Sequence, residues 1–273
     1  HEDLVREWYL TESGVKHGKS LGAKALGVYL KGHLYRQFHQ PYLELELPMP
    51  QPKFPTIRGS AGRIRDVAKA LETAQRPALV LGSQTLVNTP EPERVADAVR
   101  ALGVPVWLGG MARGLLGRRS DVQFRHKRTK ALKEADLVIV CGFPFDFRLG
   151  YGRSIGSKAT LVAANLSASD LKKNRRPEIA LHMHPGEFLV QLAAKARNTG
   201  TRADWFATLR EREAARDAEI VAIAKDEPAE GLVNPIELCL RLEEAMSDDA
   251  ALVVDGGDFV GTAAYTLRPR APL

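Results

Sequence analysis

The chain has 273 residues, of which 44% are hydrophobic and 26% are charged, so it has the composition of a folded globular protein and not of a disordered or collagen-like chain. Its formal net charge of +6 makes nucleic acid a partner to consider. Basic residues alternate with acidic ones, however, as in "REREAARDAE", and the cluster Lys172 to Arg176 falls in a connection before a strand. We therefore expect a solvated surface and no nucleic-acid partner.

Residues 1–57 predict a connection between domains. The stretch "YLKGHLYRQFHQPYLELELPMPQPKFP" mixes aromatic, basic and acidic residues and then becomes rich in proline. Proline fixes the backbone and removes a hydrogen-bond donor, so the end of this stretch favours a stiff linker over a helix or strand.

From Ser60 onward, helical segments alternate with short apolar runs. Ser60 is a candidate N-cap for a helix over Ile64 to Thr73, whose apolar residues recur at helical spacing. The apolar runs are "PALVLG", "VPVWLGG", "DLVIVCG", "ATLVAAN" and "IALHMH", and helices are expected over residues 91–102, in "TKALKEA" and over residues 186–197. This alternation is typical of a parallel sheet that is buried on both faces, and it predicts a doubly wound α/β fold.

The last third of the sequence predicts a long helix and the start of a second α/β unit. Asp204 to Lys225 is helical in composition, with Trp205, Leu209 and Ile220 as packing residues. Asn234 can cap a following helix that has Pro235 at its first position, and "ALVVDGG" then predicts a strand. We therefore place a central domain at residues 58–226 and the beginning of another domain at 227–273.

Glycines follow the first three predicted strands. In a parallel sheet, ligands bind beyond the carboxyl ends of the strands, where Gly82 and Ser83, then Gly109 and Gly110, then Gly142 would lie. A single glycine turn is usually structural, but several at one edge predict a nucleotide-type cleft. The sequence lacks both the G-x-G-x-x-G fingerprint and the P-loop, which disfavours a simple dehydrogenase and P-loop phosphate chemistry.

Three further groups of residues have side chains that could bind a ligand or a metal. Asp146, Arg148 and Arg153 in "FDFRLGYGR" could bind a ribose or a phosphate, or could pair with one another within the turn. His182 and His184 lie on one strand without a third ligand nearby, so we expect no metal site there. Cys141 and Cys239 lie in separate apolar segments and are expected to be buried thiols.

Four blocks of the sequence carry a family resemblance. "RPALVLGSQTL", "GVPVWLGGMARGLLGR", "FDFRLGYGR" and "LVVDGGDFVGTAAYTLRPRAPL" resemble the acetolactate-synthase-like group of thiamine-diphosphate enzymes over residues 60–273. Members of this group have a pyrimidine-binding, a central and a diphosphate-binding domain. The resemblance implies that this sequence is part of a longer protein, and that it covers the end of the first connection, the central domain, and the first helix and strand of the third domain.

The resemblance also implies an activity and its cofactors. The parent protein would be a carbon–carbon lyase or ligase that uses thiamine diphosphate and Mg²⁺ and acts on acyl-CoA or 2-oxo acid substrates. The turn formed by Gly256, Gly257, Asp258 and Phe259 would lie beside the diphosphate. The activating glutamate and the metal ligands belong to other domains of such enzymes, so we expect no catalytic residue and no metal ligand in this chain. A homo-oligomer and an endoplasmic reticulum membrane location, with the anchor upstream of His1, are further implications.

In related enzymes the central domain holds FAD or ADP, or has an empty cleft. The matching positions here are Gly82, Ser83, Gln84, Gly109, Gly110, Met111, Asp146 and Arg148. Asn165 stands where FAD-binding relatives tend to have an acidic residue, which places FAD in doubt and makes ADP or the nucleotide portion of CoA as plausible a ligand. The alternative function is a stand-alone module that binds ADP, FAD or NAD, or serves as a scaffold, without turnover.

Overall fold

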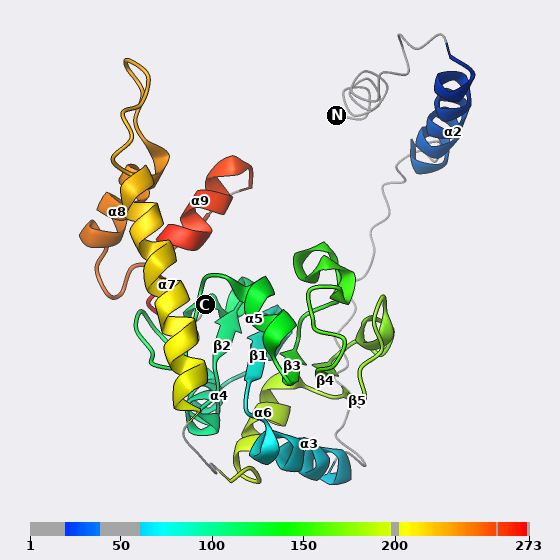
Figure 1. Cartoon of the computed structure of the whole chain (residues 1–273), viewed down its shortest axis with the longest axis vertical. Helices are drawn as coiled ribbons and strands as arrows, with labels where there is room; N and C mark the ends of the chain where they lie inside the picture. Colours follow the sequence, from blue (N-terminus) through cyan, green and yellow to red (C-terminus); the bar gives the residue numbers. More distant parts are fainter. Residues whose placement is uncertain (1–19, 39–60, 198–201, 255, 272–273) are drawn as a thin grey trace. The chain divides into compact units, whose positions relative to one another are not determined.

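The computed structural model describes residues 20–38, 61–197, 202–254 and 256–271 of the chain, which divides into two compact units, His1–Pro52 and Lys53–Leu273 (Figure 1). In the first unit the described element is helix α2 (Leu21–Phe38), in a segment for which the sequence analysis expected only a connection. None of the described helices has the length and apolar character needed to cross a bilayer. The predicted end of the connection at residue 57 lies outside the described residues.

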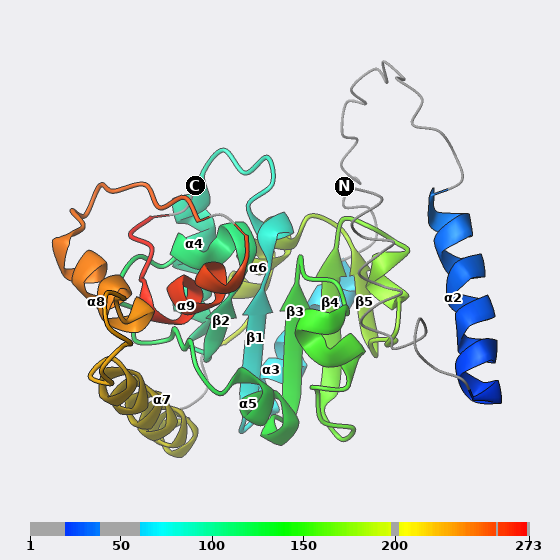
Figure 2. The same cartoon turned by 90° about the horizontal axis from the view of Figure 1, so that it is seen from above.

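The second unit is built on a five-stranded parallel sheet, which confirms the predicted α/β fold. Its strands are β1 (Pro77–Leu81), β2 (Val106–Leu108), β3 (Leu137–Cys141), β4 (Thr160–Asn165) and β5 (Ile179–His182). They lie in the order β2-β1-β3-β4-β5, as Figure 2 shows. The chain order reverses beside β1, so the turns after β1 and β3 become neighbours at the carboxyl edge.

The central strands are apolar on both faces because helices cover both. Every residue of β1 and β3 is buried. In β1, Leu79 and Leu81 pack into one cluster, while Ala78 and Val80 pack into another on the opposite face. Cys141, at the end of β3, is a buried free thiol as predicted, and so is Cys239.

Helices α3 (Ala61–Thr73), α4 (Pro92–Leu102) and α6 (Pro185–Ala193) contribute to the first of these clusters, whereas α5 (Arg128–Glu134) contributes to the second. All four lie where the sequence predicted helices. Helix α4 has proline in its first turn and is followed by the C-cap Gly103, whose φ of 58° is left-handed and suits glycine. The predicted N-cap of α3, Ser60, lies outside the described residues.

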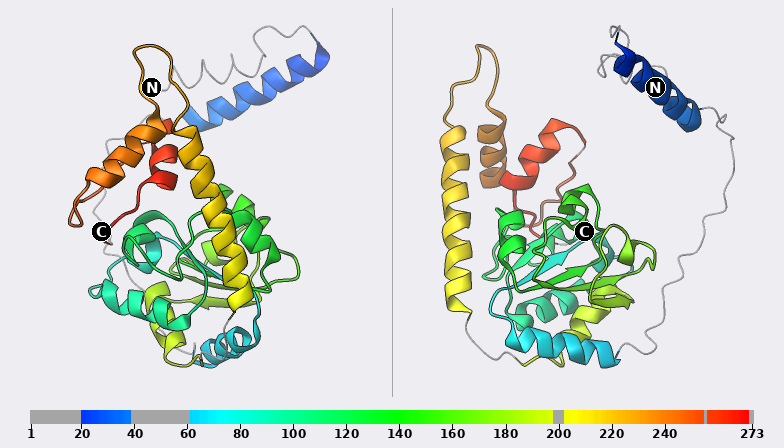
Figure 3. Two further views of the ribbon diagram at one scale, coloured as in Figure 1. Left: turned by 60° about the vertical axis from the view of Figure 1, so that its left-hand side comes forward. Right: turned by 45° about the vertical axis from the view of Figure 1, so that its right-hand side comes forward.

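Helix α7 (Ala203–Ile223) runs from the sheet to the last two helices, α8 (Pro235–Ala245) and α9 (Asp258–Thr266), as Figure 3 shows. Its Trp205 and Leu209 join the cluster on the α5 face of the sheet, and its Ile220 packs with Ile236 of α8. The side chain of Asn234 accepts hydrogen bonds from the main-chain N–H groups of the first turn of α8, as predicted. The predicted boundary at 226/227 falls between α7 and α8 and stays a prediction.

The prediction of a strand in "ALVVDGG" is wrong for the part of this segment that the structure describes. Residues 251–254 have no regular secondary structure, and Val253 is 90% exposed. A strand requires a neighbouring strand for its main-chain hydrogen bonds, and the five strands of the described sheet all pair with one another instead. Helix α9 follows this segment, whereas the sequence analysis expected no further element.

Candidate functional site

The turns at the carboxyl ends of the strands lie side by side, as the sequence predicted. The main-chain N–H of Gly82 donates to the Cys141 carbonyl oxygen at 2.8 Å, and that of Gly142 donates to Ala164 at 2.8 Å. The N–H of Gly109 donates to Leu81 at 2.8 Å. The parallel ladder thus continues into the turns and holds their backbones together.

The glycines of these turns are required by their close packing. A Cβ atom at Gly82 would overlap the carbonyl oxygen of Gly142 and approach Cδ2 of Phe143 to 2.8 Å. A Cβ at Gly109 would lie 2.8 Å from Cε2 of the same ring. At Gly110, whose φ of 56° is left-handed, a Cβ would overlap the hydroxyl of Ser83. The protein's own atoms thus fill the space next to these glycines.

The polar side chains predicted for a nucleotide cleft have partners within the protein. The Ser83 hydroxyl oxygen accepts from the Met111 N–H at 3.2 Å, and Gln84 Oε1 accepts from the Leu166 N–H at 2.9 Å. The structure therefore brings together Gly82, Ser83, Gln84, Gly109, Gly110 and Met111. Their contacts account for a structural role, and nucleotide binding stays a prediction.

Asp146 and Arg148 form the ion pair that was one of the two predicted possibilities. The Arg148 Nη2 atom lies 2.7 Å from Asp146 Oδ2, and the Arg148 N–H donates to Asp146 Oδ1 at 3.0 Å. These hydrogen bonds lower the pKa of the Asp146 carboxyl below its usual range. The Arg148 guanidinium also lies 5.0 Å from the centre of the Phe143 ring, which connects this turn to the glycine turns.

Of the four residues predicted to face a diphosphate, Gly256 and Gly257 precede helix α9, whereas Asp258 and Phe259 are its first two residues. Gly256 and Gly257 are exposed, and a Cβ on either would meet no atom within 4 Å. Gly257 has a φ of 96°, and the main-chain N–H groups of the first turn of α9 follow it. Exposed residues before a helix N-terminus suit the chemistry of an anionic phosphate group, and contact of this segment with a diphosphate stays a prediction.

An apolar cavity of 550 Å³ lies between the turn after β2 and the C-terminal segment. Gly110 and Met111 line it from one side, and Leu252, Val260 and Leu267 are among the residues that line it from the other. The cavity therefore borders Gly110 and Met111 of the predicted nucleotide cleft, and Val260, which follows the predicted diphosphate-binding residues in the sequence.

A second cavity, of 730 Å³, lies between β2, the turn after it, α5 and α9, and we call it the basic cavity. Among the described residues that line it, six are basic and none is acidic. The basic residues are Arg113, Arg125, Lys127, Arg128, Lys130 and Lys133. The sequence analysis did not single them out, although the run "RHKRTKALK" carries the signal.

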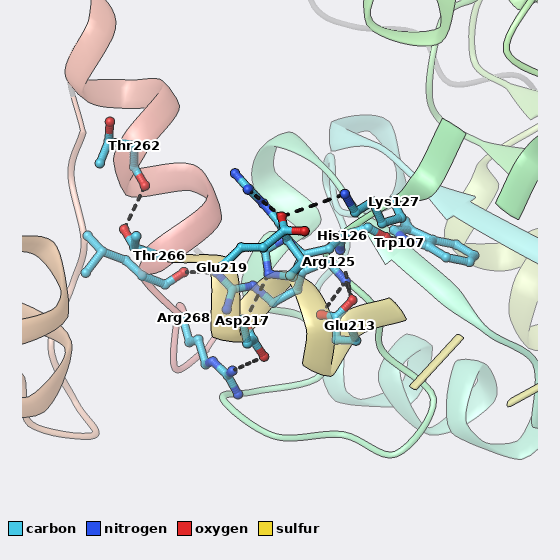
Figure 4. A network of polar contacts seen from close by, with 12 residues as sticks. Trp107, Arg125, His126, Lys127, Glu213, Asp217, Glu219, Thr262, Thr266 and Arg268 are labelled. Carbon is cyan, nitrogen blue, oxygen red and sulfur yellow. Dashed lines mark hydrogen bonds and ion pairs between the residues drawn. The ribbon is translucent and has the colours of Figure 1, made fainter. Parts of the chain in front are cut away.

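A polar network joins the connection before α5 to helix α7 and to the segment after α9 (Figure 4). Glu213 on α7 accepts from the main-chain N–H groups of Arg125 and His126 at 3.0 Å each. The His126 ring lies 3.1 Å from Asp217, whose other oxygen lies 3.6 Å from Arg268. The hydrogen bond with His126 and the positive charges of His126, Arg268 and Arg125 lower the pKa of Asp217. Sequence reasoning missed this network because its members are distant along the chain.

The two histidines predicted on one strand have structural partners, but only His182 lies on β5, and His184 is the N-cap of α6. The His184 ring accepts from the N–H groups of Gly186 and Glu187 at the start of α6, at 3.1 and 3.4 Å. The His182 ring lies 3.0 Å from the Leu166 carbonyl oxygen. Within the described ranges no cluster of three His, Cys, Asp or Glu residues could hold a metal ion.

Residues 64–192 match the family model described as the central domain of thiamine pyrophosphate enzymes. This part of the chain is a central domain of that family. The chain is 37% identical to 2-hydroxyacyl-CoA lyase 2 of Caenorhabditis elegans over 94% of its own length, and 35% identical to the protein of the same name from Homo sapiens over 99%. It is 32% identical over 76% of its length to a probable acetolactate synthase of Mycobacterium bovis.

The central domain and its flanking segments match only part of each relative. The chain spans 41% of the Caenorhabditis elegans protein, 44% of the human one and 37% of the mycobacterial one. The chain is therefore homologous to these enzymes over most of its own length, but over about two-fifths of theirs.

Proposed function

We propose that this chain is the non-catalytic central part of a carbon–carbon lyase or ligase that depends on thiamine diphosphate and Mg²⁺. The proposed substrates are 2-hydroxyacyl-CoA or 2-oxo acid compounds. The observation that carries the proposal is the similarity of nearly the whole chain to relatives that are named 2-hydroxyacyl-CoA lyase 2.

The role proposed for this chain is to position a cofactor that other parts of the protein activate. When bound, thiamine diphosphate supplies a carbon nucleophile that can attack a carbonyl group. The turn at Gly256 and Gly257 would receive the diphosphate, because its backbone is exposed and precedes α9. The central domain would support this turn through the contact of Arg113 with the Ala264 carbonyl oxygen on α9, at 2.9 Å.

Comparing this chain with a longer product of the same gene tests the proposal. We expect the 273-residue chain to show no cleavage of a 2-hydroxyacyl-CoA in the presence of thiamine diphosphate and Mg²⁺. A product that also includes a pyrimidine-binding and a complete diphosphate-binding domain should cleave it. Turnover by the 273-residue chain alone would contradict the non-catalytic role, and a gene that encodes no such domains would contradict the proposed activity.

The alternative, a stand-alone module that binds ADP, FAD or NAD, has less support. The side-chain oxygens of Ser83 and Gln84 already accept main-chain hydrogen bonds, and the Asp146 carboxylate already pairs with Arg148. Titration of the chain with ADP, FAD and NAD distinguishes the two proposals, because tight binding without any catalytic partner domain would favour the module.

A further inference from the structure

A polar cavity of 620 Å³ lies at the amino end of β1, and we call it the amino-end cavity. Arg76 lines it from the connection before β1, and Glu134 lines it from the end of α5. Arg202, Asp204 and Arg212 line it from the N-cap and the first turns of α7. The cavity therefore lies at the edge of the sheet opposite the glycine turns.

Arg212 has a donor group without an acceptor. Its Nη2 atom lies 2.8 Å from Glu134 Oε2, and its guanidinium lies 6.0 Å from the centre of the Trp205 ring. The Nη1 atom of the same side chain is shielded from solvent and has no hydrogen-bond partner in the described part of the chain. A buried donor that lacks an acceptor is unfavourable, and a ligand oxygen in the adjoining cavity would offset this cost.

Arg202 and Arg76 bring two more guanidinium groups to the cavity. Arg202 donates from Nε to the Ala74 carbonyl oxygen at 3.1 Å and from Nη2 to that of Leu71 at 2.7 Å. These bonds fix the side chain and leave its Nη1 group for a ligand. Burial lowers the pKa of Arg202, although the charge of Asp136 opposes this, so a nearby anion would be favourable. Arg76 is exposed and, among the described residues, has no carboxylate within ion-pair distance.

Two carboxylates limit the charge that the cavity can accept. Glu134 is paired with Arg212, and Asp204 is exposed in the first turn of α7. Asp136 accepts from the main-chain N–H groups of the two residues before β1, at 2.7 and 3.0 Å. Three arginines and two carboxylates in the described lining leave an excess of one positive charge. The cavity therefore suits a singly charged anion better than one with two or more charges.

The start of α7 adds main-chain donors to these guanidinium groups. The first N–H groups of a helix have no acceptor within the helix, and the N-cap residue of α7 makes no side-chain hydrogen bond to them. Three residues of this first turn, Ala203, Asp204 and Trp205, line the cavity. Arginine forks match the two oxygens of a planar carboxylate. The volume of 620 Å³ lies in the range of small-molecule sites, roughly 300–1,000 Å³.

We propose that the amino-end cavity binds a small molecule through a single carboxylate group, which Arg76, Arg202 and Arg212 hold. The site does not depend on the reaction proposed for the whole protein, because it lies at the other edge of the sheet from the predicted cofactor residues. Its residues come largely from the start of α7, so a bound carboxylate should stabilise the first turns of that helix.

Calorimetric titration of the 273-residue chain with sodium acetate at pH 7 tests this inference. We expect acetate to bind with a dissociation constant on the order of 1 mM, as suits so small a ligand. Arg76→Gln should weaken binding about tenfold. The Arg76 side chain is exposed, so this variant should fold normally, which thermal unfolding checks.

Two further measurements locate the bound acetate. Arg212→Lys keeps the positive charge but not the planar fork, and it should also weaken binding. Hydrogen exchange monitored by mass spectrometry should show slower exchange in the first turns of α7 when acetate is present. Unchanged exchange there, together with unchanged affinity of Arg212→Lys, would place the acetate elsewhere and would overturn the proposal.

The matched control is Arg210→Gln, which removes the same charge from an exposed position on α7 outside the cavity lining. It should bind acetate with unchanged affinity. Succinate and sulfate should bind no more tightly than acetate, because their second negative charge meets the carboxylates of Glu134 and Asp204. Tighter binding of either dianion, equal weakening by Arg76→Gln and Arg210→Gln, or no binding of acetate would overturn the proposal.

Discussion

At the scale of single residues, Phe143 is the packing centre of the strand-end turns. Its ring fills the space beside Gly82 and Gly109, and the guanidinium groups of Arg148 and Arg128 lie 5.0 and 5.7 Å from its centre. One aromatic residue thus connects the glycine turns to the Asp146 turn and to the edge of the basic cavity.

We expect Gly82→Ala to lower the free energy of unfolding by about 1–3 kcal/mol, because the added methyl group meets the main chain of Gly142 and the Phe143 ring. Urea denaturation measures the change. Gly62→Ala in α3 is the control, since its nearest neighbour would be an arginine tip at 3.9 Å, and it should not destabilise the protein. Equal stability of Gly82→Ala and wild type would show that the turns can relax around the methyl group.

At the scale of elements, Asn234 connects two helices. Its Oδ1 accepts from the N–H groups of Ile236 and Glu237 at the start of α8, at 2.9 and 3.3 Å. Its amide nitrogen donates to the carbonyl oxygens of Ile223, the last residue of α7, and of Asp226 in the turn that follows, at 2.8 and 3.1 Å. The same side chain therefore caps one helix and fixes the end of the other.

Asn234→Ala should lower the free energy of unfolding by about 1–2 kcal/mol and should speed amide hydrogen exchange in the first turn of α8. Asn234→Asp keeps the acceptor oxygen but loses the donor. It should therefore lower the free energy of unfolding less than Asn234→Ala does, and it should speed exchange mainly in the turn after α7. Hydrogen exchange monitored by mass spectrometry separates these regions. Identical exchange in the two variants would contradict a separate role for the amide nitrogen.

The sequence predicted these elements well because their signals are local. Pro92, Gly103, Asn234 and Pro235 mark helix ends through their own backbone chemistry. The segment 251–254 was predicted wrongly because a strand depends on a partner that the sequence pattern does not reveal. Helix α2 was missed because its residues show little separation of apolar and polar faces.

At the scale of the whole molecule, the network around Asp217 connects the sheet domain to α7 and to the segment after α9. The pKa of the Asp217 carboxyl is lowered chiefly by the hydrogen bond with His126. A carboxyl whose folded pKa lies below its unfolded value, about 3.9, stabilises the fold at higher pH. That contribution is lost as the pH falls from about 4 through the lowered pKa.

We therefore expect Asp217→Asn to destabilise the protein at pH 7 and to have a smaller effect under strongly acidic conditions, where wild-type Asp217 is itself protonated. Denaturant unfolding measured across this pH range tests the prediction. Asp121→Asn, at an exposed aspartate, is the control and should leave the curve unchanged. A stability loss from Asp217→Asn that is the same at every pH would contradict a role for the carboxylate charge.

The sequence by itself determined the α/β class, the chain order of the elements from α3 to α8, and the family, because apolar periodicity, caps and motif blocks are properties of neighbouring residues. It also predicted that glycine turns gather at one sheet edge. Only the tertiary structure decided that these glycines pack against Phe143 and one another, and that Asp146 pairs with Arg148. The basic cavity likewise depends on the order of strands and on the docking of α9, which bring together side chains that no local pattern relates.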